Sequence, residues 1–418
     1  MSYKHKQIMS TEDIKQEVME EPPDKKPKLS ATLAVSSILA DEYTNSPALV
    51  EVLIGRINDK KQISRYIKDL NEKLPLTSLQ HLKRCHKQKI VIQKCSEMND
   101  VPVLKYLKDL GIDVKDLDGV FEKRRVPASS VKLKWQFDEM NQIWPLNFHP
   151  DKNLEQMYNN QMFTDQELQR HQEYLQLALR LSQENITKIL QDKYITTSPQ
   201  SKAAPSIFQK YQKNPETCQE SFTNHGALAV DPAIDSIVAV GYDLRQLHPA
   251  QHCCLVLVDN VAKGQNGGAW SDGMFETDPT ADLKSESIKE DMDDDLNTKG
   301  VSECFKKLIL TDDYQFKIGS KPVIAPKQNS DQSTNSEQKS GPYLCTGYDV
   351  YLTHEPCCFC AMALTHSRVS RVFYLFDNLE NGALRSRMKL HTVKDLNHRF
   401  EAYKCDLSST ILYSVFLK

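Results

Sequence analysis

Two short segments of the chain contain the side chains best suited to chemistry. Residues 248–254 read HPAQHCC and residues 355–360 read EPCCFC, and each segment is expected at the start of a helix. Cys357 and Cys360 are three positions apart, so both thiolates can point the same way from a first helical turn, where exposed N–H groups favour the anion. Zinc takes imidazole and thiolate ligands in a tetrahedron. The spacing therefore predicts a zinc site with the ligands His252, Cys357 and Cys360, and a fourth position for water or another group.

A lone Cys-x-x-Cys motif also fits two buried core thiols or a redox pair. Pro356 directly before the first cysteine is typical of a helix that begins after a strand. A histidine at the start of a second helix, after a predicted hairpin, completes a ligand set that neither alternative needs. The combination favours the metal site.

The two segments together resemble the zinc signature of the cytidine/deoxycytidylate deaminase superfamily, H-x-E followed by P-C-x-x-C. In that superfamily the metal activates a water and the Glu transfers protons. In this chain Cys254 occupies the position of the catalytic Glu, and a thiol is a poor substitute for a carboxylate. Asp243 and Asp259 are the nearest acids in the sequence, but neither is at the right helical position. The resemblance therefore implies a zinc site with no catalytic residue.

Within the superfamily, the chain resembles the non-catalytic subunits of the eukaryotic heterodimeric tRNA wobble-adenosine deaminase. Residues 343–351 (YLCTGYDVY), 355–369 (EPCCFCAMALTHSRV) and 395–400 (DLNHRF) carry this resemblance, as do Trp144-Pro145 and Phe148-His149. It covers residues 144–405. It implies a catalytic partner subunit with an intact H-x-E motif, and a complex that converts adenosine to inosine at the first anticodon position of tRNA.

One departure from the family concerns Cys254, since the corresponding position is often Val. Neither residue transfers protons as Glu does, so the non-catalytic interpretation is unaffected. The thiol leaves two arrangements open. Cys254 could be a fourth zinc ligand that closes the tetrahedron, or a neutral thiol packed beside the metal with another group in the fourth position.

The elements that must position these residues follow an α/β pattern. A capping box at residues 164–167 predicts the start of a long amphipathic helix. Strands are expected at 225–230, 236–240, 343–352, 371–376 and 400–404, with the first two forming a hairpin, and helices at 249–262 and 357–367. This order predicts a three-layer deaminase-like domain with a mixed sheet over residues 141–418. Residues 263–341 are predicted to be a largely disordered insertion.

A smaller α/β or α+β domain is predicted for residues 31–140, after a disordered tail at 1–30. The pattern predicts a strand at 50–54, helices at 63–74 and 78–85, and a strand at 90–92. From residue 51 to residue 134 there are 19 Lys and Arg against 11 Asp and Glu. This excess predicts RNA binding through phosphates. The candidate residues are Lys83, Arg84, Lys87, Lys89, Lys123, Arg124 and Arg125.

The composition supports a water-exposed globular chain. Of its 418 residues, 39% are hydrophobic and 26% are charged. No apolar run is long enough for a membrane span, and the N-terminus has no apolar segment typical of a secretory signal. The eleven cysteines are expected as thiols or metal ligands. Residues 22–28 (PPDKKPK) resemble a nuclear import signal, so we expect the protein in nucleus and cytoplasm.

Three functions remain open from the sequence. The first is a non-catalytic, tRNA-binding subunit, the second an active nucleotide or base deaminase with a substitute acid, and the third a zinc-stabilised structural protein without an RNA role. Cys254 argues against the second function, and the basic N-terminal region argues against the third.

Overall fold

A computed structural model describes residues 33–98, 102–183, 225–245, 248–270, 296–310, 315–322, 343–409 and 411. The predicted tail at 1–30, with the segment that resembles an import signal, lies outside these residues. Helices in the described part of the chain are too short or too polar to cross a membrane.

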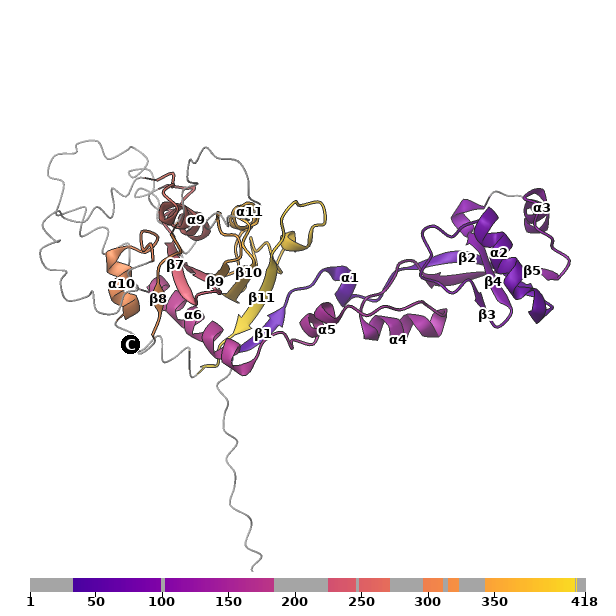
Figure 1. Cartoon of the computed structure of the whole chain (residues 1–418), viewed down its shortest axis with the longest axis horizontal. Coiled ribbons are helices and arrows are strands. Elements are labelled where there is room, and N and C mark those ends of the chain that lie inside the picture. The colour runs from indigo at the N-terminus through magenta and orange to yellow at the C-terminus, as the bar shows by residue number, and fades with distance from the viewer. Residues whose placement is uncertain are drawn as a thin grey trace, which may run out of the picture. The chain divides into compact units, whose positions relative to one another are not determined.

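A seven-stranded mixed sheet forms the C-terminal part of the structure (Figure 1). β10, β9 and β6 form its centre. β6 is antiparallel to its neighbours β9 and β7, whereas β9, β10 and β11 run parallel. The strand order is β1-β11-β10-β9-β6-β7-β8. The strands are β1 (Ala34–Ser37), β6 (Gly226–Asp231), β7 (Ser236–Tyr242), β8 (Lys317–Ile318), β9 (Asp349–His354), β10 (Arg371–Phe376) and β11 (Glu401–Asp406).

Helices cover both faces of this sheet, which gives the three layers that the sequence predicts. α6 (Asp165–Gln183) and α10 (Glu303–Leu310) share one apolar core with the sheet. α9 (Cys253–Gly264) and α11 (Cys358–His366) share the second core, on the other face. The α/β fold class is confirmed. The two helices that carry the predicted metal ligands therefore lie on the same face.

Local sequence signals explain where these elements begin and how they stack. At the start of α6 the backbone N–H of Glu167 donates to the hydroxyl of Thr164 at 3.3 Å, and the Thr164 N–H donates to the Glu167 carboxylate at 2.8 Å. This is the predicted capping box. Aromatic rings also stack across the parallel strands, because Tyr351, Phe373 and Tyr403 occupy matching register positions with centroids 5.0 Å apart.

A second, four-stranded antiparallel sheet lies in the N-terminal part, in the order β3-β4-β2-β5. Its strands are β2 (Leu49–Ile57), β3 (Cys85–His86), β4 (Lys89–Lys94) and β5 (Leu117–Pro127). α2 (Ile63–Lys73) and α3 (Val103–Asp109) pack on one face, and α4 (Lys134–Ile143) packs on the other. The short helices α1 (Asp41–Thr44) and α5 (Lys152–Tyr158) complete this part, with 3₁₀ turns at Lys60–Gln62 and Cys95–Glu97 and a further one at Leu390–Thr392.

The structure differs from the sequence prediction in four places. The strand predicted at 343–352 begins only at Asp349, because residues 344–347 form turns. The helix predicted at 78–85 is instead a series of turns that leads into β3, because Leu82 forms a β-bridge with Leu146. β1 lies within residues assigned to the N-terminal domain, yet it pairs with β11 of the seven-stranded sheet. The predicted disordered insertion at 263–341 contains α10 and β8, because Phe305, Ile309 and Ile318 are buried in the core under α6. The last three differences depend on partners distant in the sequence, which a local pattern does not reveal.

Candidate metal centre

His252 and Cys357 occupy equivalent positions, each as the capping residue before a helix. His252 precedes α9 with extended backbone (φ −65°, ψ 152°), and its carbonyl accepts from the N–H groups of Leu255 and Val256. Cys357 precedes α11 in the same way (φ −69°, ψ 171°). Extended backbone at a helix cap turns the side chain away from the helix axis. The two residues therefore project into the space between the helix starts.

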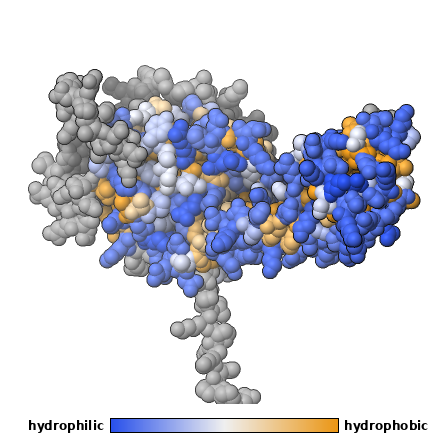
Figure 2. All heavy atoms as spheres, turned by 45° about the vertical axis from the view of Figure 1, so that its right-hand side comes forward, coloured by the Kyte–Doolittle hydropathy of each residue, from blue (hydrophilic) through white to orange (hydrophobic). Residues whose placement is uncertain are grey.

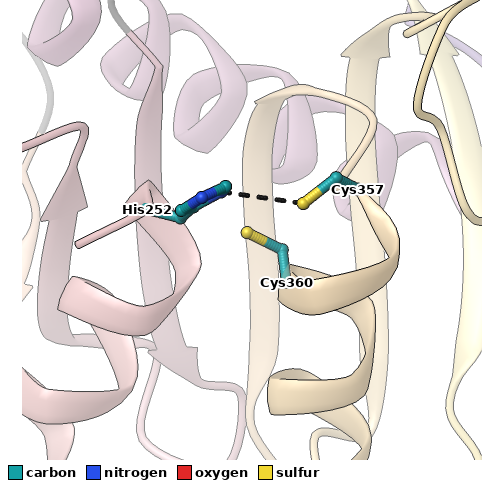
Figure 3. A group of neighbouring side chains, drawn as sticks. All are labelled: His252, Cys357 and Cys360. Carbon is teal, nitrogen blue, oxygen red and sulfur yellow. Dashed lines mark hydrogen bonds between the residues drawn. The ribbon is translucent and has the colours of Figure 1, made fainter. Parts of the chain in front are cut away.

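The three predicted ligands lie together (Figure 3). The donor atoms of His252, Cys357 and Cys360 are all within 4.8 Å of one another, and Nδ1 of His252 is 3.6 Å from Sγ of Cys357. Cys360 is buried, while the other two are half-buried. The ring of Phe359, itself half exposed, packs edge-on against the His252 ring at 5.4 Å. The constellation predicted from the sequence is thus present in the fold.

The separation between Nδ1 of His252 and Sγ of Cys357 fits a tetrahedral metal. Zinc with bonds of about 2.3 Å to sulfur and about 2.0 Å to nitrogen separates the two donor atoms by about 3.5 Å. The observed separation of 3.6 Å matches that value. Without a metal, the interaction with Cys360 and burial raise the pKa of the Cys357 thiol to about 12. A bound cation reverses this preference, because a coordinating thiol is deprotonated.

Cys254 is buried beside this group but is not part of it. Its thiol interacts with Cys360, which lowers its pKa, but burial and the neighbouring Cys253 and Cys357 together hold that pKa above its ordinary value. A neutral thiol neither donates nor accepts protons as readily as a carboxylate near pH 7. The position that corresponds to the catalytic acid of the H-x-E motif is therefore filled by a small, buried thiol.

The two candidate substitute acids are engaged elsewhere. Nε of Arg245 donates to both carboxylate oxygens of Asp243, at 2.9 and 2.8 Å. Asp259 accepts from the N–H of Ala269 at 2.5 Å and pairs with Lys263 at 3.3 Å. The carboxylates of both residues already have cationic or backbone partners inside the fold. Neither residue replaces the missing Glu.

Sequence reasoning missed the residue that positions the second ligand segment, Glu355. This carboxylate is buried and accepts from the N–H groups of Asn378 (3.1 Å), Leu384 (2.9 Å), Arg385 (2.6 Å) and Ser386 (2.9 Å), and from the Ser386 hydroxyl. Burial raises the pKa of Glu355, but these hydrogen bonds lower it by more, so the pKa lies below its usual value. The anion thus fixes the loop at 378–386 against Pro356 and Cys357.

Gly382 makes this contact possible. A Cβ atom at this position would overlap Oε2 of Glu355, and Gly382 forms a β-bridge with Cys357. A glycine at position 382 does not identify the contact from the sequence, since Glu355 is 27 residues away. The local signal that could have indicated the contact is an acid directly after an apolar strand and before a Pro-Cys pair, because an acid expected to be buried needs hydrogen-bond partners.

A pair of stacked imidazoles, His225 and His354, lies near the centre at the ends of β6 and β9. Their rings are 4.4 Å apart and 17° from parallel. Burial, and then His354, lower the pKa of His225 to about 4, and it also interacts electrostatically with His252. Burial also lowers the pKa of His354, so a pair of neutral rings lies near His252.

The seven predicted RNA-binding residues are not all at the surface. Lys83, Lys87, Lys123 and Arg125 are exposed, and Lys89 and Arg124 are half-buried. Arg84 is buried, and its guanidinium donates to Asn71 at 2.9 Å and to the carbonyls of Val91 (3.2 Å) and Ile92 (3.0 Å). Its assignment as an RNA contact is wrong, because its donors are consumed inside the fold. Burial accordingly lowers the pKa of Arg84 to about 10.

Comparison with known proteins gives several related sequences, although no family model matches the chain. A "Probable inactive tRNA-specific adenosine deaminase-like protein 3" from Danio rerio is 29% identical over 388 residues, which cover 89% of this chain and 91% of that protein. The protein of the same name from Homo sapiens is 26% identical, covering 88% of each chain. The "tRNA-specific adenosine deaminase subunit TAD3" of Saccharomyces cerevisiae is 43% identical over 72 residues, 16% of this chain and 22% of its own length.

Proposed function

We propose, from the premise that this chain is a homologue of the probable inactive tRNA-specific adenosine deaminase-like proteins, that it is a non-catalytic, tRNA-binding subunit. The complex would deaminate adenosine to inosine at the wobble position of tRNA anticodons. The observation that carries the proposal is the pairing of an intact ligand group with Cys254 at the acid position. A chain that keeps the metal site but lacks the proton shuttle retains the fold without the chemistry.

We infer that the metal is zinc, held by His252, Cys357 and Cys360. One imidazole and two thiolates form a donor set that zinc prefers over magnesium or calcium. The metal would tie the starts of α9 and α11 together and so stabilise one face of the sheet. Glu355 contributes by holding the loop at 378–386 against the Cys357 end of this link.

The catalytic step would belong to a partner subunit with an intact H-x-E motif. Relatives from Saccharomyces cerevisiae and Schizosaccharomyces pombe are named as subunits of a tRNA-specific adenosine deaminase, which supports this assignment. This chain would supply a matching deaminase-like fold and an RNA-binding N-terminal part. We place the complex in nucleus and cytoplasm, on the basis of the basic segment at 22–28.

An active deaminase with a substitute acid is the competing function. Asp243 and Asp259 are the acids that such a mechanism would need, and both are held by cations or backbone donors. The competing function therefore requires rearrangement of two ion pairs near the site, and the proposal requires none.

An inosine assay on a tRNA with adenosine at the first anticodon position tests the proposal. We expect no turnover by the zinc-loaded chain alone, turnover when the catalytic partner is added, and none with Cys254→Glu alone. Turnover by the isolated chain would establish the competing function. No contribution of the chain to the partner's turnover or tRNA binding would leave only a structural role.

A further inference from the structure

We propose that one face of the four-stranded sheet binds phosphate groups of the RNA backbone. This basic face is defined by Arg56, His86, Lys89 and Arg124. The inference rests on the proposed function, which it deepens by assigning the RNA-binding surface. It differs from the sequence prediction in adding Arg56 and His86. It keeps Lys89 and Arg124 and leaves out Lys83, Arg84, Lys87, Lys123 and Arg125.

Strand register places three of these residues in a row. His86 of β3 pairs with Lys89 of β4, and Lys89 pairs with Arg56 of β2. Residues directly opposite one another in an antiparallel sheet share a face, and like charges there destabilise the sheet. Glu122 of β5 offsets part of this repulsion through an ion pair with Lys89 at 2.6 Å. A row that still carries net positive charge is suited to an anionic ligand.

The row lies just outside the part of the sheet that α4 covers. On the same face, Val52, Ile54, Val91 and Val126 are buried against Met140 and Trp144. Arg56 and Lys89 are two positions beyond Ile54 and Val91, so they point to the same side but past this cover. Arg56 is exposed and forms no ion pair with any residue that the structure describes. Its guanidinium is available to a ligand.

Trp144 connects the row to Arg124 and Lys83. Its indole N–H donates to the carbonyl of Lys83 at 2.7 Å, and its ring lies 6.1 Å from the His86 ring and 5.8 Å from the Arg124 guanidinium. Arg124 also donates to the carbonyl of Ile143 at 3.4 Å. His86 and Arg124 therefore both lie against a buried side chain. Lys87 belongs to the neighbouring β3–β4 turn and has positive φ (50°).

The neighbours of Arg124 face the other way. Lys123 pairs with Leu53, whose side chain packs with α2 and α3, and Arg125 pairs with Glu51 and lies 3.6 Å from its carboxylate. Alternation along β5 thus separates three consecutive basic residues onto opposite faces. Figure 2 shows mainly hydrophilic residues on the visible surface of this part of the chain. Both faces of the four-stranded sheet carry basic residues, and the strand register shows which of these residues share a face.

A nucleic-acid backbone is the occupant that this geometry favours. The row spans two inter-strand spacings, about 10 Å, and a nucleic-acid strand presents a phosphate every few ångströms. Two long cations and an imidazole at fixed spacing can contact successive phosphates without reading bases. The planar guanidinium of Arg56 is suited to bidentate contact with phosphate oxygens.

The test compares two double variants of the full-length, zinc-loaded chain, R56Q/K89Q on the basic face and K123Q/R125Q on the opposite face. The probe is a transcribed tRNA with adenosine at the first anticodon position, titrated at several salt concentrations. We expect R56Q/K89Q to lower affinity on the order of tenfold at low salt and to reduce the salt slope by about 2. The control K123Q/R125Q should stay near the unsubstituted chain. Thermal unfolding of both variants should be unchanged.

A third variant, Glu122→Gln, distinguishes loss of a phosphate contact from a folding defect, because it is expected to increase binding, which a folding defect would not do. Removing this acid frees Lys89, so we expect tighter tRNA binding and a steeper salt slope. Equal effects of the two double variants, or normal binding by R56Q/K89Q, would overturn the inference. Failure of the unsubstituted chain to bind tRNA at all would instead reject RNA binding by the isolated subunit, and with it the proposed function.

Discussion

In the proposed function, Cys254 is the residue that distinguishes a candidate metal site from an active site. The superfamily motif places an acid two positions after the histidine ligand, and this chain places a buried thiol there. The side chain contacts Cys360 yet lies outside the group formed by His252, Cys357 and Cys360. This geometry favours the arrangement in which Cys254 packs beside the ligand group and is not a fourth ligand.

X-ray absorption of the zinc-loaded protein should count two sulfur ligands. We expect Cys254→Val to leave this number at two, because Val removes a thiol that is not bound. Cys357→Ser should lower the sulfur count and the zinc content together. Three sulfurs that fall to two in Cys254→Val would show instead that Cys254 closes the tetrahedron. A protein without zinc would reject the metal site altogether.

The three ligands could be predicted from sequence because each lies in a short motif at a helix start, where spacing dictates direction. Arg84 and Glu355 could not, since their roles depend on where distant strands and loops place hydrogen-bond partners. A basic residue in a basic run is ordinarily exposed, and only the fold shows that Arg84 donates inward.

Elements position the ligands through close helix–sheet contact. β7 passes directly under the first turns of α9, and Gly241 is the point of contact. A Cβ atom there would lie 2.6 Å from the carbonyl oxygen of Cys253 and 2.7 Å from Cβ of Leu257. The absence of a side chain at Gly241 thus allows the start of α9, which follows His252, to lie close to β7. The predicted strands and helices of this core are confirmed within four residues, except that the strand predicted from residue 343 begins at Asp349. Their burial follows from local apolar runs.

Gly241→Ala should weaken both stability and metal binding. Overpacking of this kind costs about 1–3 kcal/mol, and the displaced start of α9 moves His252 relative to the two thiolates. We expect zinc affinity, measured by competition with a chelator, to fall on the order of tenfold. Gly264→Ala, at the far end of the same helix, is the matched control, because its Cβ atom would meet only Ser320 Oγ at 3.3 Å. Equal zinc affinity in the two variants would contradict the positioning role of Gly241.

At the scale of the whole molecule, stability depends on buried histidines that must stay neutral. His171 of α6 stacks on Phe373 at 4.4 Å, and its Nδ1 lies 2.8 Å from the Tyr351 hydroxyl. Burial, and then the nearby Arg371, lower the pKa of His171 to about 4 from the ordinary value of 6.5. His225 has the same direction and value. The core under α6 and the region beside the ligand group therefore each contain a buried imidazole that is neutral in the folded protein near pH 7.

Acid should therefore destabilise the fold through these groups. Between pH 6.5 and about 4 the unfolded chain binds a proton at His171 that the folded chain does not. The stability is thus complete above the unfolded pKa and is lost as the pH falls towards the folded one. For one such imidazole the loss by pH 5 is about 2 kcal/mol. Urea unfolding of the unsubstituted chain and of His171→Asn at about pH 7.5 and about pH 5 measures it. The variant should be less stable at the higher pH but lose less on acidification. Because both chains keep the same metal ligands, acid release of zinc contributes equally to each, and an identical loss in the two chains would refute the role of His171.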